Sequence, residues 1–301
     1  MFHHFHGAGH GASQGAISAE QLDRMIAYLG RKSFLSAEEW KERALDGSLS
    51  AGALCITFDD ALKCQVDVAL PVLEAHGLTA FWFVYTSVLE GNVEPLEIHR
   101  YFRHACFPDL DGFYAAFERA VLDSPHAARI APLWVTFRPE AYFPECTFYT
   151  DNDRRFRFTR AALGPSAYNE IMDGLIAAAR VDLTEVARNL WLDWSAVRRL
   201  RAGGHVIGLH SHTHPARLAD LSPERQRWEY QTNARLLTEA LGEPPDTMSH
   251  PCGSYTHDTL AILKQLGIRL GFFHSMARES FSDLEWPRED HSHIIRAMGN
   301  S

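Results

Sequence analysis

Short apolar segments and longer amphipathic segments alternate along the 301-residue chain. Residues 54–58 and 204–209 are short, are rich in apolar and β-branched side chains, and predict two buried strands. Residues 112–122 and 169–179 carry apolar side chains at helical spacing, and residues 222–241 begin with Ser-Pro and stop before a glycine, as helices do. Each predicted strand ends where a loop begins, which is where α/β folds usually assemble active sites.

Three histidines follow the strand predicted at 204–209. His210, His212 and His214 lie close together in sequence, and imidazoles at this spacing are candidate metal ligands. Pro215 disfavours helical backbone at His214, so the arrangement does not fit the helical histidine pair of zincins. The alternative is an ordinary solvated loop, because the chain contains 17 histidines.

The strand predicted at 54–58 ends in two adjacent carboxylates, Asp59 and Asp60. Adjacent side chains on a strand point to opposite sides, so one aspartate can bind a cation while the other holds a different position around it. The alternative is that the pair caps a helix starting near Ala61, a common use of aspartate. Taken alone, the pair favours this capping interpretation.

Together the two stretches resemble the polysaccharide deacetylase family, also called the NodB-homology family or carbohydrate esterase family 4. Its first motif, Thr-Phe-Asp-Asp-Gly, corresponds to residues 57–61, with alanine replacing the glycine. Its second, His-Ser/Thr-x-x-His-Pro, corresponds to residues 210–215. Its third, Arg-x-Pro-x-Gly, matches residues 249–255 in the proline and glycine alone. The resemblance covers about residues 50 to 275, apart from a long insertion.

The resemblance implies an α/β fold, namely a distorted (β/α) barrel of seven or eight strands. We expect residues 1–301 to form this single domain, with a helical cap inserted at about 90–190. This length and a hydrophobic content of 46% suit one barrel-sized domain.

The resemblance also implies a divalent metal ion held by Asp60, His210 and His214, with Asp59 as the general base. Two imidazoles and one carboxylate leave coordination positions open for water and substrate, as a catalytic site requires. Zinc is the expected ion, and cobalt, nickel or iron suit the same ligands. The backbone N–H of Cys252 would help to stabilise the oxyanion.

Two catalytic residues of the family are missing from their usual places. The arginine that orients the base aligns with Ser249; Arg288 is the candidate replacement, although an arginine in this charged turn is also typical of protein surface. No Leu-x-Leu-x-His segment supplies the general acid. Some relatives are circularly permuted and carry this histidine on the first strand, where His3 matches best and His4 is next. The alternative there is a disordered, tag-like N-terminus, whereas the interleaved phenylalanines favour a native strand.

The long insertion contains a segment, residues 149–160, that mixes four arginines with aromatic residues. Such arginines are suited to binding phosphate or carboxylate, so we predict that Arg154 and Arg155 hold an anionic part of a sugar substrate. The alternatives are a solvated helix face or a surface between protomers. Tyr255 and Trp286 are further candidate substrate contacts, and His212 is expected to be a neighbour of the metal site.

Composition limits the cellular location and the binding partners that we expect. No 18-residue apolar run and no secretory signal are visible, so we expect no membrane span. Five scattered cysteines without Cys-x-x-Cys spacing predict reduced thiols and a cytoplasmic location. A net charge of −9 argues against a nucleic-acid partner.

The sequence therefore predicts a metal-dependent hydrolase that removes an N-acetyl or other short N-acyl group from an amino sugar of a bacterial surface polysaccharide or its precursor. Its substrate would be an N-acylated amino sugar, a nucleotide sugar or an oligosaccharide, and a homo-oligomer is left open. One alternative is a cyclic imide or ureide amidohydrolase on the same fold, which the missing arginine at Ser249 keeps open. The other is a non-catalytic sugar-binding protein, against which the presence of Asp59 argues.

Overall fold

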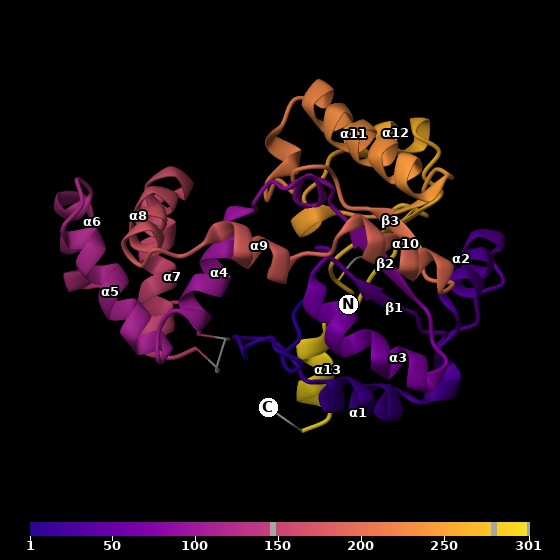
Figure 1. Cartoon of the computed structure of the whole chain (residues 1–301), viewed down its shortest axis with the longest axis horizontal. Helices are drawn as coiled ribbons and strands as arrows, with labels where there is room; N and C mark the ends of the chain where they lie inside the picture. The colour runs from indigo at the N-terminus through magenta and orange to yellow at the C-terminus, as the bar shows by residue number, and fades with distance from the viewer. Residues whose placement is uncertain (145–148, 278–281, 300–301) are drawn as a thin grey trace. The chain divides into compact units, whose positions relative to one another are not determined.

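The structure, a computed structural model, describes residues 1–144, 149–277 and 282–299. The chain forms two compact units, each of which is described by itself (Figure 1). The first combines Met1–Glu94 with Ala187–Ser301, and the second is Pro95–Val186. The second unit falls in the stretch where the sequence predicts a helical insertion.

A parallel sheet forms the centre of the first unit (Figure 1). Its strands, in spatial order, are β1 (Ile56–Phe58), β2 (Ala80–Val84), β3 (Val206–Leu209), β4 (Thr247–Ser249) and β5 (Leu270–Phe272). Every residue of these strands is buried, as expected where both faces of a parallel sheet are covered. The strands predicted at 54–58 and 204–209 correspond to β1 and β3.

Single-residue bridges extend the sheet beyond both outer strands. Phe2 pairs in parallel with β1, and Trp286 pairs in parallel with β5. The two added segments also meet each other, because the His291 N–H donates to the Met1 carbonyl at 3.3 Å. Segments far apart in sequence therefore complete the curled sheet.

Helices cover the sheet on its outside. They are α1 (Ala19–Leu29), α2 (Ala37–Asp46), α3 (Leu70–His76), α10 (Trp194–Ala202), α11 (Pro223–Leu241), α12 (His257–Gln265) and α13 (His291–Ala297). Shorter helical turns are η1 (Arg31–Ser33), η2 (Gln65–Ala69), η3 (Ser87–Glu90), η5 (Leu218–Asp220) and η6 (Pro251–Gly253). The helix predicted at 222–241 is α11: Ser222 caps it by accepting the N–H of Arg225, and Gly242 ends it in left-handed backbone with φ 81°.

Aromatic rings fill the interior of the first unit and leave no room for a side chain at one position of β3. The ring of Phe272 lies 5.5 Å from that of Trp40 and 5.4 Å from that of Phe83. A Cβ at Gly208 would lie 2.6 Å from both the Phe83 ring and the Thr247 hydroxyl. Glycine at this position therefore lets β3 lie close to the side chains of Phe83 and Thr247.

The second unit is helical among its described residues. Its helices are α4 (Pro95–Ala105), α5 (Leu110–Leu122), α6 (Ala127–Thr136), α7 (Asp151–Leu163), α8 (Pro165–Ala178) and the start of α9 (Leu183–Leu190), with the turn η4 (Pro139–Ala141). The helices predicted at 112–122 and 169–179 largely coincide with α5 and α8. Its core is aromatic and includes Phe113, Phe117, Phe156 and Tyr168.

Within the described ranges, no helix has both the length and the apolar character needed to cross a bilayer. The four cysteines found there, Cys55, Cys64, Cys106 and Cys252, are free thiols. Cys146 lies outside the described residues.

Candidate metal centre and active site

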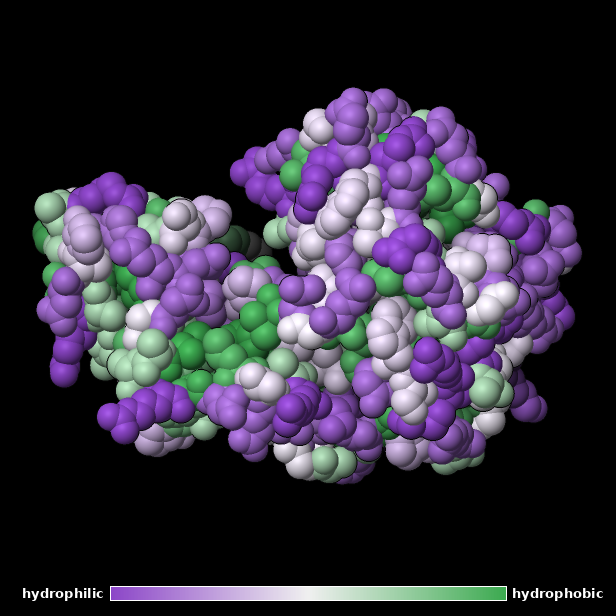
Figure 2. Space-filling view, turned by 45° about the horizontal axis from the view of Figure 1, so that its top comes forward, coloured by the Kyte–Doolittle hydropathy of each residue, from purple (hydrophilic) through white to green (hydrophobic). Residues whose placement is uncertain are grey.

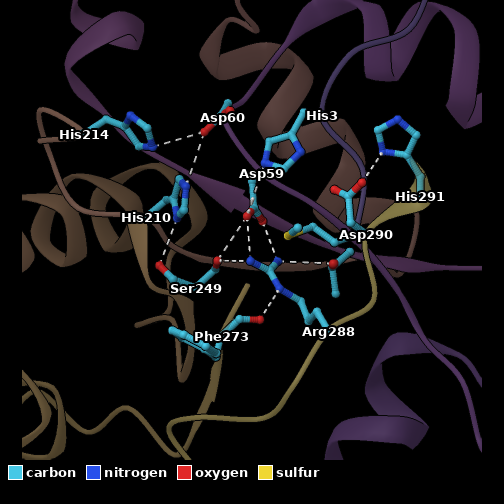
Figure 3. Close-up of polar contacts among 12 residues, drawn as sticks. His3, Asp59, Asp60, His210, His214, Ser249, Phe273, Arg288, Asp290 and His291 are labelled. Carbon is cyan, nitrogen blue, oxygen red and sulfur yellow. Dashed lines mark hydrogen bonds and ion pairs between the residues drawn. The ribbon is translucent and has the colours of Figure 1, made fainter. Parts of the chain in front are cut away.

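The candidate residues gather where the strands of the sheet end (Figure 3). Asp59 and Asp60 follow β1, His210 follows β3, and Ser249 ends β4. Because parallel strands have their C-terminal ends at one edge of the sheet, these side chains meet although they are far apart in sequence. Barrel folds place their active sites at this edge.

Three side chains form a possible metal site. The Nε2 atoms of His210 and His214 each lie 3.3 Å from Oδ1 of Asp60, as Figure 3 shows. One ligand atom from each residue lies within 4.8 Å of the other two. The structure thus brings together the three ligands that the sequence predicts.

The local environment of these three residues fits a cation. Oδ1 of Asp60 is buried and accepts no hydrogen bond from the described residues, so it has an open acceptor position between two imidazole nitrogens. Burial disfavours the charge of Asp60, but His214 and His210 outweigh it and hold the pKa of this carboxyl well below its usual range. Nδ1 of His210 lies 2.9 Å from the Ser249 carbonyl, which fixes the ring with Nε2 toward the site.

Arg288 holds Asp59 through a paired ionic contact. Its Nη1 and Nη2 donate to Oδ1 and Oδ2 of Asp59, each at 2.7 Å, and Nη1 also donates to Thr57 at 3.2 Å. Its Nε donates to the Phe273 carbonyl at 3.0 Å. Burial raises the pKa of Asp59, but Arg288 and His210 outweigh this effect and lower it. Arg288 is 5% exposed, so it is not the surface arginine of the alternative interpretation.

Ser249, which aligns with the family arginine, contacts both partners of this ion pair. Its hydroxyl lies 2.7 Å from Nη2 of Arg288 and 3.2 Å from Oδ2 of Asp59. The guanidinium therefore reaches the base from the segment after β5, and the small serine side chain leaves room for it.

His3 lies beside Asp59 because its segment pairs with β1. Phe2 donates its N–H to the Thr57 carbonyl at 2.9 Å, and its side chain is buried, so this segment belongs to the fold. Nε2 of His3 is 3.8 Å from Oδ2 of Asp59. The ring of His4 lies 6.4 Å from that of His3.

One buried side chain that sequence reasoning missed supports this arrangement. Gln65 is 1% exposed, and its Nε2 donates to the carbonyls of His3, at 2.8 Å, and Asp59, at 2.6 Å. It follows Cys64, whose Sγ accepts the N–H of Phe5 at 3.4 Å. Gln65 therefore ties the first segment to the end of β1, and its partners are visible only once the chain is folded.

Two further residues predicted to lie near the metal site, Cys252 and His212, follow strands at the same edge of the sheet. Cys252 is in η6, after β4, with left-handed backbone of φ 50°. His212 is outside the three-residue metal cluster, and its Nδ1 lies 2.9 Å from the Thr86 hydroxyl.

The two arginines predicted to bind substrate make contacts within the second unit. Arg154 donates to the carbonyls of Tyr149, at 2.7 Å, and Tyr142, at 3.1 Å. Arg155 pairs with Glu118 at 2.9 Å and stacks on a tryptophan ring 4.7 Å away. These contacts stabilise the unit itself, and a role in substrate binding stays a prediction.

The two aromatic candidates are also engaged with other residues. The Tyr255 hydroxyl donates to Oε1 of Glu285 at 2.5 Å, and its ring stacks on His250 with centroids 4.0 Å apart. Trp286 packs edge-on against Trp40 in the core, with centroids 5.2 Å apart. Their role as substrate contacts likewise remains a prediction.

Comparison with known proteins connects this site to a family. The family model for polysaccharide deacetylase matches residues 159–271. This range includes the second and third motifs but not Asp59 and Asp60. No curated protein sequence matches the chain.

Solved deacetylase structures share the fold over nearly the whole chain. The Streptococcus pyogenes deacetylase PplD in complex with acetate is 16% identical, with 99% of this chain and 96% of that chain covered and a TM-score of 0.55. IcaB from Ammonifex degensii is 15% identical, with coverages of 99% and 94% and a TM-score of 0.55. A de-N-acetylase from Aggregatibacter actinomycetemcomitans is 14% identical, with coverages of 95% and 91% and a TM-score of 0.53.

These findings confirm the resemblance to the polysaccharide deacetylase family and the predicted fold, a distorted (β/α) barrel of the NodB-homology type. The family match, over residues 159–271, supports carbohydrate deacetylation as the class of activity.

Proposed function

We propose that the chain is a metal-dependent N-deacetylase that acts on an N-acylated amino sugar. One observation carries this proposal: Asp60, His210 and His214 converge beside a second carboxylate, Asp59, which Arg288 holds in place. The family match and the likeness to deacetylase structures support the class of reaction. The metal requirement, the sugar and its origin in a bacterial surface polysaccharide or precursor are parts of the proposal.

Asp60, His210 and His214 would hold the cation, with zinc as the first candidate and cobalt, nickel or iron as others. A divalent ion bound there would lower the pKa of a water molecule and polarise the acyl carbonyl. The His210 ring is ready for this role because its other nitrogen is already fixed by the Ser249 carbonyl.

Asp59 would accept the proton of the attacking water. Its lowered pKa keeps it ionised at neutral pH, and Arg288 cannot lose a proton to it because a guanidinium stays charged in proteins. The paired contact also fixes the orientation of the carboxylate, leaving its remaining lone pairs for the water. The Cys252 N–H is proposed to stabilise the oxyanion.

His3 would protonate the leaving nitrogen. It lies 3.8 Å from Asp59, close to where the proton is first taken up. Burial lowers the pKa of His3, with Asp60 and Asp59 opposing, so its protonated form is favoured below neutral pH. We infer that His3, rather than His4, is this acid, because His3 is the histidine that contacts the base.

The alternatives lose support from the same geometry. The missing arginine at Ser249 kept the cyclic imide hydrolase open, and Arg288 supplies that guanidinium from another segment. A sugar-binding protein without catalysis would not need a carboxylate held as firmly as Asp59. A cytoplasmic location and a homo-oligomer stay predictions.

The experiment is metal analysis of protein purified without chelator, followed by acetate release from a panel of N-acetylated amino sugars, nucleotide sugars and oligosaccharides. We expect Asp60→Ala to lose both metal and activity. Asp59→Asn should keep the metal and lose activity by about 100-fold or more, as expected for loss of a general base. Retention of both metal and activity by Asp60→Ala would refute the proposal.

A further inference from the structure

One helix of the barrel turns an unusually polar face inward. The outward surface over α11 is largely hydrophilic (Figure 2), as expected for an outer helix. Its inward face is polar as well in the first half, since Gln226, Glu229 and Asn233 are all at most 1% exposed. These residues lie three or four positions apart, so they share one side of the helix. Buried polar groups need partners, and for two of these residues the partners belong to the metal site.

Glu229 binds the segment between the two ligand histidines. Its Oε2 accepts the backbone N–H of His212 at 3.1 Å and of Thr213 at 2.7 Å. Its Oε1 accepts the hydroxyl of Thr213 at 2.7 Å and Nη2 of Arg225 at 3.2 Å. Three of these four hydrogen bonds come from the loop itself.

Asn233, one turn further along α11, holds the beginning of the same loop. Its Oδ1 accepts the backbone N–H of His210 at 3.0 Å. Its Nδ2 donates to the Val84 carbonyl at 2.9 Å and to the Thr86 hydroxyl at 3.1 Å, so it also connects His210 to the end of β2. The two residues together contact the loop at three positions, His210, His212 and Thr213.

The histidine loop, residues 210–214, has backbone that needs such support. Ser211 and His214 adopt left-handed φ angles of 64° and 53°, which L-residues other than glycine disfavour. These two residues flank His212 and Thr213, the pair that Glu229 binds. Conformations of this kind persist where surrounding contacts determine them, and here a buried carboxylate provides the contacts.

We propose that Glu229 is a positioning residue: it holds the histidine loop in the left-handed conformation that aims His210 and His214 at the cation beside Asp60. This inference rests on the function proposed above, because it assigns Glu229 to the same metal site. Glu229 is not one of the three candidate ligands, and it would act through the backbone of the loop.

The test measures metal affinity directly. Zn²⁺ is titrated against a competing chelator at 25 °C with the wild type, Glu229→Ala, Glu229→Gln and the control Glu239→Ala. Loss of such a supporting contact typically costs about 10- to 100-fold in metal affinity, which we expect for Glu229→Ala. Glu229→Gln should lie between it and the wild type, because its amide keeps one acceptor oxygen. The control should match the wild type, since Glu239 is exposed on the same helix and pairs with Arg235.

A second readout separates positioning from general stability. In the metal-free proteins, hydrogen exchange at the amides of His212 and Thr213 should be faster in Glu229→Ala than in the wild type, while amides of β2 should be unchanged. A merely structural role would lower Tm without altering metal affinity at 25 °C. If Glu229→Ala does not fold, Glu229→Gln decides the matter, and wild-type affinity in it would overturn the inference.

The outcomes distinguish this inference from the proposed function. If the wild type binds Zn²⁺ no better than Asp60→Ala, the proposed function fails, and the positioning role fails with it. If the wild type binds Zn²⁺, Asp60→Ala does not, and Glu229→Ala binds as the wild type does, the positioning role alone is overturned.

Discussion

Two buried histidines at the two ends of β3 have opposite environments. His205, just before the strand, is 4% exposed, and His210, just after it, is 2% exposed. Nδ1 of His205 accepts the backbone N–H of Ala80 at 3.0 Å and the indole N–H of Trp82 at 3.1 Å. Burial lowers the pKa of His205 to about 4. His205 is thus neutral and supports the packing of two strands.

His210 has the same burial but different neighbours. Its Nδ1 contacts a carbonyl, and its Nε2 faces Asp60 at 3.3 Å. Burial lowers the pKa of His210, but Asp59 and Asp60 outweigh it and raise the value above that of a free imidazole. The comparison shows that neighbouring charge, and not burial, distinguishes a candidate ligand from a core histidine. Barrels separate the two roles in this way, with stability at one end and chemistry at the other.

The largest effect should come from removing the guanidinium of Arg288, which holds the candidate base Asp59 at the C-terminal end of the strands. In Arg288→Met, Asp59 becomes a buried carboxylate without a paired charge, which should lower the free energy of unfolding by about 3–5 kcal/mol. Activity should fall by about 100-fold, as expected when a catalytic base is misplaced. Urea unfolding and kcat/KM measure the two effects. Arg269→Met is the control, since Arg269 is half-exposed and 3.8 Å from its partner carboxylate. Activity within a few-fold of the wild type would contradict the assignment of Arg288.

A smaller effect, on stability alone, is expected at the other end of β3, where His205 lies. The pKa of His205 is about 4 in the folded chain and near 6.5 when unfolded, so its contribution to stability is present above pH 6.5 and lost as the pH falls toward 4. Between pH 7.5 and 5, this residue should account for about 2 kcal/mol of lost stability. His205→Asn keeps an acceptor near Nδ1 but does not titrate, so urea unfolding should show a shallower pH dependence. The same dependence in both proteins would show that His205 is not neutral. Metal binding at pH 7.5 should be unchanged.

The smallest effect is expected in the second, helical unit. Arg154 and Arg155 contact their own unit, and a purely structural role would change KM for the active sugar by less than about twofold in the double alanine variant. Its stability should fall by about 1 kcal/mol or less, as is usual for partly exposed ion pairs. A tenfold rise in KM at unchanged stability would instead favour the substrate-binding role that the sequence predicts.

The three candidate metal ligands and the candidate base were predictable because each follows a recognisable strand. Asp59 and Asp60 end one apolar run, and the histidines follow another, so local patterns and the resemblance to a family identified them. Arg288 was predictable only as a replacement for a missing residue, since its segment forms a single bridge at Trp286 and carries no strand periodicity.

The residues that hold the site in place could not be predicted in the same way. Gln65 and Glu229 contact backbone atoms of distant segments, and no local pattern indicates which carbonyl or N–H a side chain will meet. A signal did exist for Glu229, because Gln226, Glu229 and Asn233 share a helix face with the fully buried Tyr230 and Leu237. Polar residues on an otherwise apolar helix face indicate a partner inside the fold.

The closure of the sheet by distant segments also has a consequence for synthesis on the ribosome. Asp59 is made before Arg288, the charge that makes its burial favourable and that follows 229 residues later. Until then a nascent chain cannot complete the base pocket, because Asp59 would be a buried and unpaired charge. A chain truncated before Arg288 should therefore lose the ion pair that holds Asp59, and with it the candidate active site. A residue translated long after Asp59 therefore decides whether Asp59 can act.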